Sequence, residues 1–193
     1  MQARAPGLIM TEVTDSVIDL DFTRRLPPAA ALPPQLQSLQ SAGEIGATAL
    51  GTVGYHVTIT QRESQQRRPG SQRTVLIIDD EESVRMVLEQ HLREDGYATR
   101  SAGNRPQILQ ALQTPPLPDL ILLDVEMHDA DGFDLLDKFH QSKVIGNIPV
   151  VMLTARCNRK DIMKGLTLGA AGYITKPAKL TAISAALRAL LGS

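Results

Sequence analysis

The sequence predicts an α/β fold with five parallel strands in one doubly wound sheet. Short apolar runs, typical of strands buried on both faces of a parallel sheet, lie at residues 75–78, 120–123, 150–153 and 173–175. Stretches with helical spacing of apolar residues separate these runs, so strand and helix alternate over about 120 residues. Right-handed crossovers then place the helices on both faces of the sheet.

The first half of this region contains two strand–helix repeats. We expect the first strand at residues 74–79 and a second, more polar strand at residues 97–101, which suits the edge of the sheet. The helix between them ends at Gly96, a residue typical of helix C-caps. Its apolar face comprises Val84, Val87, Leu88 and Leu92. The second helix ends before a pair of prolines, because proline cannot continue a regular helix.

The second half supplies three more strands, each followed by a helix. We expect these strands at residues 119–124, 148–154 and 172–175. The final helix has a continuous apolar stripe, made of Leu180, Ile183, Leu187, Leu190 and Leu191. The carboxyl ends of all five parallel strands then share one edge, where open α/β sheets place their ligand sites.

The chain divides into a small N-terminal segment, a linker and one full domain. Residues 1–60 contain proline pairs and glycines, and we expect this segment to be small or partly disordered, with a strand possible at residues 55–60. Residues 61–73 have no apolar side chain, which is typical of a flexible polar linker. The α/β domain occupies residues 74–193.

Composition excludes several classes of function. A net charge of −1 gives no electrostatic case for binding nucleic acid or an anionic membrane. No apolar run approaches the ~18 residues that a membrane span needs, and no secretory signal opens the chain. Cys157 is the single cysteine, so no internal disulfide can form. We therefore expect a soluble, cytoplasmic protein.

Polar residues end the apolar strands and meet at the shared edge. Asp79 and Asp80 follow the first strand and Asp124 follows the third, while Thr154 and Lys176 end the fourth and fifth. Like charges this close stay ionised only when a cation offsets them, and an all-oxygen ligand set suits Mg²⁺. Each residue alone also fits a simpler role, such as a helix cap or a surface lysine. Their convergence favours a site.

The combination of these groups suits phosphoryl transfer. Asp124 is the candidate nucleophile, and Mg²⁺ would shield its charge. Lys176, the hydroxyl of Thr154 and the backbone N–H of Ala155 would bind the oxygens of the transferred anion.

Residues 74–191 resemble the receiver domain of response regulators, of the chemotaxis-regulator type, in two-component signalling. Four motifs in register support the resemblance: Val-Leu-Ile-Ile-Asp79-Asp80-Glu-Glu-Ser, Leu-Ile-Leu-Leu-Asp124-Val-Glu-Met-His-Asp-Ala-Asp-Gly132, Ile-Pro149-Val-Val-Met-Leu-Thr154-Ala155 and Gly-Ala-Ala-Gly-Tyr173-Ile-Thr-Lys176-Pro177. The resemblance implies a flavodoxin-like fold with strand order 2-1-3-4-5.

The resemblance also implies roles for the residues around the predicted acidic site. Asp124 would accept phosphate from a sensor histidine kinase or a phosphotransfer protein. Asp80 would bind Mg²⁺ directly and Asp79 mostly through water, with Asp124 and the backbone carbonyl of Glu126 completing the protein ligands. Lys176 would pair with Asp124 and then with the phosphoryl group.

The resemblance further implies a conformational switch. Thr154 would move toward the phosphoryl group, Tyr173 would follow inward, and the Lys176-Pro177 peptide would be cis. His128 stands where the family usually has proline. It is either an exposed turn residue or a group that modulates the lifetime of the phosphate. Glu126 could hydrogen-bond or crowd the attacking water.

Other classes of function and the route of output stay open from the sequence. A pseudo-receiver used only for protein contacts is one alternative, and a haloacid-dehalogenase-type phosphatase is another. If the chain is a receiver, we expect no enzymatic activity beyond accepting the phosphoryl group and releasing it. Output would pass through the N-terminal segment or a downstream protein partner on residues 160–191, because the chain ends just past the last helix. A homodimer that forms on phosphorylation is also compatible with the sequence.

Overall fold

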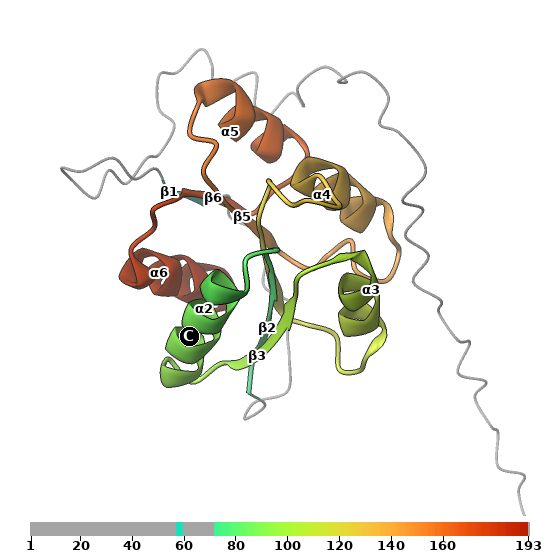
Figure 1. Ribbon diagram of the computed structural model, residues 1–193, viewed down its shortest axis with the longest axis vertical. Coiled ribbons are helices and arrows are strands. Elements are labelled where there is room, and N and C mark those ends of the chain that lie inside the picture. Colours follow the sequence, from blue (N-terminus) through green and yellow to red (C-terminus); the bar gives the residue numbers. More distant parts are fainter. Residues whose placement is uncertain (1–56, 60–71, 193) are drawn as a thin grey trace, which may run out of the picture.

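One sheet of six strands forms the centre of the computed structural model, which describes residues 57–59 and 72–192. The strands are β1 (Val57–Ile59), β2 (Thr74–Ile78), β3 (Ala98–Ala102), β4 (Leu120–Leu123), β5 (Val150–Thr154) and β6 (Gly172–Thr175). Their order across the sheet is β1-β6-β5-β4-β2-β3 (Figure 1). Strands β2 to β6 are parallel, and β1 pairs antiparallel with β6.

The five parallel strands confirm the predicted topology. Counted along the chain from β2, their order is 2-1-3-4-5. Strands β2, β4, β5 and β6 are buried along their whole length, as their apolar sequences predict. The polar strand β3 lies at the edge and is only partly buried, also as predicted.

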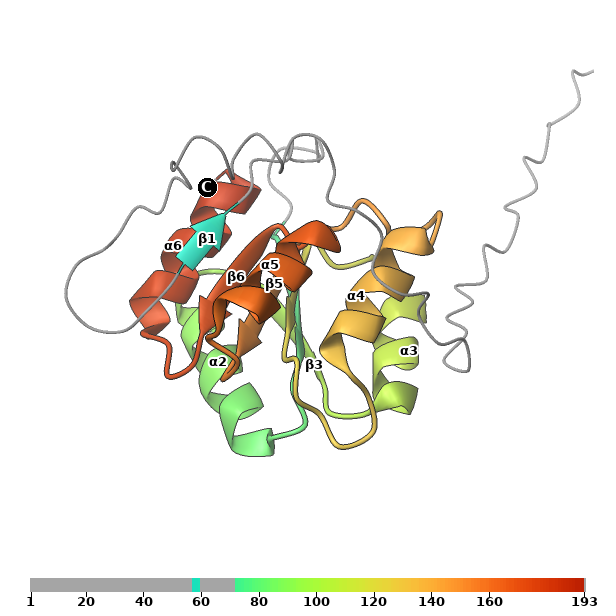
Figure 2. The ribbon, with the colours of Figure 1, turned by 90° about the horizontal axis from the view of Figure 1, so that it is seen from above.

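Within residues 72–192, five helices cover the two faces of the sheet. They are α2 (Glu82–Glu94), α3 (Arg105–Gln113), α4 (Gly132–Gln141), α5 (Arg159–Thr167) and α6 (Leu180–Leu191). Helices α2 and α6 lie on one face, and α3, α4 and α5 lie on the other (Figures 1 and 2). Each face encloses its own apolar core, one around Leu92 and Leu187 and the other around Phe133 and Tyr173.

Most of the predicted helix faces are buried, with one exception. Leu88 and Leu92 are buried on α2, and four of the five residues of the α6 stripe are buried. The placement of Val87 in the buried stripe of α2 is wrong, because its side chain is 54% exposed. The i, i+4 row through Leu88 and Leu92 faces the sheet, and Val87 lies about 100° away around the helix. Gly96 follows the end of α2 with a φ of +89°, as expected for a C-cap glycine.

Strand β1 belongs to the predicted N-terminal segment, and it joins the sheet of the α/β domain. The rest of that segment, and the linker as far as residue 71, lie outside the described residues. Arg73, at the end of the linker, donates a hydrogen bond to the carbonyl of Leu191 and forms an ion pair with Asp119. Among residues 57–59 and 72–192, no helix has the length and apolarity needed to cross a membrane.

Candidate functional site: an acidic cluster at the carboxyl edge of the sheet

Three carboxyl groups from two strand ends form a cluster. Ligand oxygens of Asp79, Asp80 and Asp124 all lie within 4.8 Å of one another. Asp79 and Asp80 follow β2, and Asp124 follows the adjacent strand β4. The Asp124 N–H donates a hydrogen bond to the carbonyl of Ile78 in β2 at 2.8 Å, which holds the two strand ends together. Asp79 and Asp124 are buried, and Asp80 is partly exposed. The structure thus brings together the three acids that the sequence predicts to meet.

Lys176 joins two of these acids from the end of β6. Its Nζ lies 2.7 Å from Asp79 Oδ2 and 3.2 Å from Asp124 Oδ1. Burial lowers the pKa of Lys176, but the hydrogen bond to Asp79 and the charge of Asp124 outweigh burial and raise it above its usual value. The Lys176-Pro177 peptide is cis, as predicted.

The buried position of Asp124 disfavours its ionised form. Burial raises its pKa to about 6, and the neighbouring charge of Asp79 acts in the same direction. The charge of Lys176 and a hydrogen bond from that side chain oppose the rise. A further cation beside Asp124 would favour its carboxylate form, and a set of three carboxylates is the hard oxygen environment that Mg²⁺ prefers. The residues present therefore fit the ion.

Thr154 and Tyr173 lie on the neighbouring strands and share one loop. Both side chains are buried. The hydroxyl of Thr154 accepts the N–H of Arg156 at 3.1 Å, and the hydroxyl of Tyr173 donates to the carbonyl of Arg156 at 2.9 Å. Lys176 N–H donates to the carbonyl of Thr154 at 2.7 Å. Ala155 follows β5 and is exposed, so its position at the rim agrees with the sequence prediction.

The loop after β4 returns closely to the strand that precedes it. Gly132 N–H donates to the carbonyl of Val125 at 2.9 Å, and Asp131 caps α4 by accepting the N–H groups of Phe133 and Asp134. A Cβ at Gly132 would lie 2.3 Å from the carbonyl oxygen of Asp124. Glycine is therefore required at this position by the close approach of two backbone segments.

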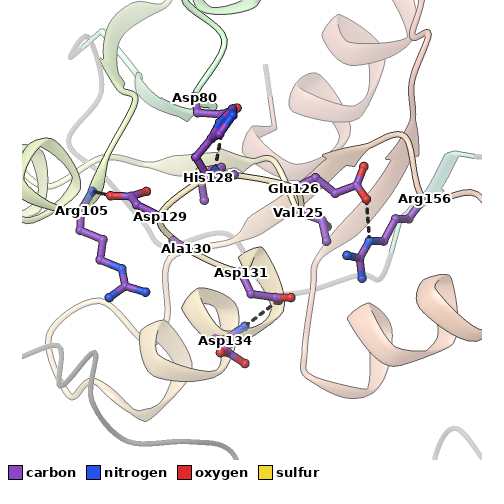
Figure 3. Close-up of a pocket in the computed structure, with 11 residues that line it drawn as sticks. Asp80, Arg105, Val125, Glu126, His128, Asp129, Ala130, Asp131, Asp134 and Arg156 are labelled. Atoms are coloured by element: carbon purple, nitrogen blue, oxygen red, sulfur yellow. Dashed lines mark hydrogen bonds and ion pairs between the residues drawn. The ribbon is translucent and has the colours of Figure 1, made fainter.

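An open depression of about 680 Å³ adjoins the cluster on the side of this loop (Figure 3). Asp80, Glu126 and His128 line it, and Arg156 closes one side by donating from Nε to Glu126 Oε1 at 3.1 Å. Glu126 N–H also donates to Asp124 Oδ2 at 3.1 Å. The backbone at Glu126 is thus in direct contact with the candidate nucleophile.

His128 contacts the most exposed of the three acids. Its N–H donates to Asp80 Oδ2 at 3.0 Å, and its ring Nδ1 contacts the same oxygen (Figure 3). Burial acts to raise the pKa of Asp80, but the hydrogen bonds and charge of His128 outweigh it, so the pKa is lowered. The His128 side chain itself is 97% exposed. The exposure of His128 agrees with the first alternative named from the sequence, and its effect on the lifetime of the phosphate stays a prediction.

Two arginines of the site were not found from the sequence. Arg85, in the first turns of α2, donates from Nη1 to the carbonyls of Asp79 at 2.7 Å and Asp80 at 3.0 Å. Arg156 holds Glu126 and accepts from Tyr173 through its carbonyl. In the sequence, Arg85 is marked only by its place shortly after the acid pair, and Arg156 only by its place two residues after Thr154. Neither position specifically indicates a site residue, because surface arginines are common at helix starts and in loops.

Comparison with known families decides the class of this domain. The family model described as the response regulator receiver domain matches residues 75–188. The chain belongs to the response regulator receiver domain family. The matched range contains the acid cluster, Thr154 and Lys176, and the receiver domain is a module of two-component systems.

Named relatives match about three fifths of this chain and about half of their own length. The alkaline phosphatase synthesis transcriptional regulatory protein PhoP of Bacillus subtilis is 36% identical over 61% of this chain and 48% of that protein. The phosphate regulon transcriptional regulatory protein PhoB of Pseudomonas aeruginosa is 35% identical over 62% of this chain and 52% of that protein. The chain therefore spans about half the length of these relatives.

Solved receiver domains share the fold. A putative response regulator from Chloroflexus aurantiacus is 30% identical and covers 64% of this chain and all of its own, with a TM-score of 0.59. The chemotaxis protein CheY4 of Vibrio cholerae is 25% identical, with coverage of 63% and 100% and a TM-score of 0.58. Both matches agree with the α/β fold predicted from the sequence.

Proposed function

We propose that this receiver accepts a phosphoryl group on Asp124, with Mg²⁺ bound beside it, from the phosphorylated imidazole of a sensor histidine kinase or a phosphotransfer protein. One observation carries the proposal. The ligand oxygens of three acids converge within 4.8 Å, and Lys176 lies between Asp79 and Asp124. Structural acids are usually arranged to keep like charges apart, whereas a phosphoryl-transfer site needs them together.

The metal would be held by oxygen ligands at the edge of the sheet. Asp79, Asp80, Asp124 and the backbone carbonyl of Glu126 are the candidate ligands. When bound, Mg²⁺ supplies positive charge that offsets the carboxylates and the oxygens of the phosphoryl group. Asp80 is accessible for this role because it is partly exposed, while Asp79 and Asp124 line the buried side.

The transfer is an in-line displacement at phosphorus. A carboxylate oxygen of Asp124 forms the new O–P bond while the P–N bond of the donor breaks, and the imidazole nitrogen leaves with the bonding electron pair. Without the metal, burial raises the pKa of Asp124 to about 6, and the charge of bound Mg²⁺ would favour the carboxylate form that attacks phosphorus. Lys176 and the backbone N–H of Ala155 bind the transferred oxygens. Water later attacks phosphorus and restores Asp124, so the receiver limits its own signal and turns over no substrate.

Phosphorylation is transmitted through Thr154 and Tyr173. The hydroxyl of Thr154 turns from the N–H of Arg156 toward the phosphoryl group. Tyr173 shares the Arg156 backbone with Thr154, so a change at one side chain alters the hydrogen bonding of the other. The ring of Tyr173 is already buried in this structure, so the proposed coupling acts through its hydrogen bond to Arg156 and needs no further inward movement.

Output passes from residues 160–191 to a downstream protein partner, to the N-terminal segment, or to a second copy in a phosphorylation-dependent homodimer. Relatives such as PhoP and PhoB carry names of transcriptional regulators, and this chain spans about half of each. The processes that those proteins regulate are therefore not assigned to this chain.

Phosphoryl incorporation tests the proposal. The full chain is incubated with acetyl phosphate, with Mg²⁺ or with EDTA, and its intact mass is measured for the wild type and Asp124→Asn. We expect a gain of one phosphoryl group only for the wild type with Mg²⁺. Lack of incorporation would instead favour a pseudo-receiver, and repeated hydrolysis of phosphate esters would favour a phosphatase of the haloacid-dehalogenase type.

A further inference from the structure

The outer edge of β6 is covered by a strand from the N-terminal side of the chain. In β1, Val57 lies opposite Ile174, Thr58 opposite Tyr173 and Ile59 opposite Gly172. Figure 2 shows β1 alongside β6, next to α6. In the five-stranded sheet of β2 to β6, β6 is an edge strand, and an edge strand presents N–H and carbonyl groups without partners. Strand β1 supplies those partners.

The register allows β1 to come from the same chain. Because β1 is antiparallel and ends opposite Gly172, it ends at the edge of the sheet where β2 begins. Four strand spacings separate β1 from β2, or roughly 19 Å at ~4.8 Å per strand. A fully extended chain over residues 60–73 reaches up to roughly 45 Å. No second copy is needed to place β1 on β6.

Strand β6 is attached to the acidic cluster at two points. Lys176 directly follows it and contacts Asp79 and Asp124. Tyr173, which lies opposite Thr58, donates to the carbonyl of Arg156, whose N–H donates to Thr154 Oγ1. The strand that pairs with β1 is therefore connected both to the candidate nucleophile and to the candidate switch residues.

Charge at Asp124 would act on this strand. Lys176 Nζ lies closer to Asp79, at 2.7 Å, than to Asp124, at 3.2 Å. Phosphorylation replaces the single negative charge of the Asp124 carboxylate with about −1.5 to −2 on the phosphoryl group, a net gain of about −0.5 to −1, and so attracts Lys176 more strongly. Because β4 lies between β2 and β6, movement of Lys176 from Asp79 toward Asp124 brings the ammonium back toward β6 and shifts the end of that strand toward β1. Ile174, which pairs with β1, lies only two residues before Lys176, so the shift disturbs this pairing. A strand of three residues has few hydrogen bonds with which to resist.

We propose that the outer edge of β6 is a docking surface for residues 57–59 of the same chain, and that phosphorylation of Asp124 releases them. The receiver thereby reports its state to the N-terminal segment, and the released edge of β6 becomes available to another strand. The release rests on the proposed function, while the docking does not.

Hydrogen exchange with mass spectrometry on the full chain tests the docking. Because backbone N–H groups alternate in direction along an antiparallel strand, proline at one of two neighbouring positions removes a bond to β6 and at the other does not. We expect only one of Val57→Pro and Thr58→Pro to speed the exchange of those amides of residues 172–175 that face β1, while the amides that face β5 and residues 120–123 stay unchanged in both. Protection that survives in both variants, or that depends on protein concentration, would overturn docking within one chain.

The release is tested by the same exchange after treatment with acetyl phosphate and Mg²⁺, with incorporation followed by intact mass. We expect amides of residues 57–59 to exchange at least about tenfold faster in the phosphorylated wild type, and at an unchanged rate in treated Asp124→Asn. Unchanged exchange in a phosphorylated protein would overturn the release alone. Absence of incorporation would instead remove the proposed function and leave the docking result standing.

Discussion

The ionised Asp124 side chain is needed for the proposed function, but its charge is buried and lowers the stability of the metal-free protein. Burial and the charge of Asp79 raise its pKa to about 6, above the value of about 3.8 for an aspartate in an unfolded chain. The folded state therefore binds this proton more tightly than the unfolded state. The resulting stabilisation is fully present below pH 3.8 and is lost as the pH rises through about 6.

Replacing Asp124 with asparagine should stabilise the metal-free protein. In EDTA at pH 7.5 we expect the free energy of unfolding to rise by about 1–3 kcal/mol, because the buried charge is removed while the shape is kept. Urea denaturation at pH 4, 5, 6 and 7.5 measures the effect, which should shrink toward zero at pH 4. The exposed Glu94→Gln is the control and should change little. A gain independent of pH would contradict this explanation.

Glu126 and Arg156 cover one approach to Asp124. Their ion pair joins the loop after β4 to the loop after β5, beside the carboxyl group that would carry phosphate. If this ion pair restricts the access of water to the phosphoryl group, Glu126→Ala shortens the lifetime of the phosphorylated protein by roughly a factor of 3 to 10. This factor corresponds to about 1 kcal/mol of activation free energy for dephosphorylation.

The loss of phosphoryl mass with time measures that lifetime. Arg156→Ala should shorten it similarly because it breaks the same pair, while Glu126→Gln keeps the size and a hydrogen-bonding oxygen and should stay close to wild type. An unchanged lifetime in Glu126→Ala would show that this side chain has no part in dephosphorylation.

The loop between β4 and α4 is the element that depends most on a single small residue. A methyl group at Gly132 would meet the carbonyl oxygen of Asp124 at 2.3 Å and Val125 Cα at 2.6 Å. Both are backbone atoms, and one belongs to the residue that we propose is phosphorylated. The geometry of this loop and that of the acid cluster are therefore not independent.

Gly132→Ala should destabilise the domain by about 1–3 kcal/mol, as expected when a well-packed region is overfilled. Gly103→Ala is a matched control, because the atoms nearest to its methyl group belong to the Arg85 side chain and not to the backbone. Thermal denaturation of both variants separates the two cases. Equal effects would mean that contact with the backbone at Asp124 is not the cause.

At the scale of the whole molecule, the sequence predicts the fold well because the fold repeats one pattern. Buried parallel strands are apolar throughout, and β2, β4, β5 and β6 are found where those runs lie. The acid cluster was also predictable, because the carboxyl ends of parallel strands share an edge. The order of the strands in the sheet was predicted from the family resemblance, because an apolar run does not show which strands lie next to it.

The remaining features depend on contacts that local sequence does not encode. The sequence suggests a strand near residues 55–60, but not that three residues of it pair antiparallel with β6. Val87 has helical spacing with Val84 yet is exposed, because a stripe of apolar residues on a helix is wider than the face the sheet covers. Arg85 and Arg156 act through backbone carbonyls and a partner loop, which only a folded chain brings near.

Magnesium should stabilise the whole domain through the acid cluster. At tenfold excess over its dissociation constant, an ion that binds only the folded state adds about 1.4 kcal/mol to the free energy of unfolding. Asp80→Asn should lose most of this gain. Asp129→Asn, which alters the adjoining depression but not the cluster, should retain it. Denaturation with MgCl₂ and with NaCl at matched ionic strength separates ion binding from screening, and a gain preserved in Asp80→Asn would contradict the site.

The identity of the phosphorylated side chain is the central claim, and chemical mapping tests it most directly. The wild-type chain is phosphorylated with acetyl phosphate and Mg²⁺, reduced with borohydride, digested and sequenced by mass spectrometry, because borohydride converts an acyl phosphate on aspartate to homoserine. The account predicts homoserine at position 124 and at no other aspartate. Homoserine at position 79 or 80, or phosphate that survives reduction on a hydroxyl group, would contradict it.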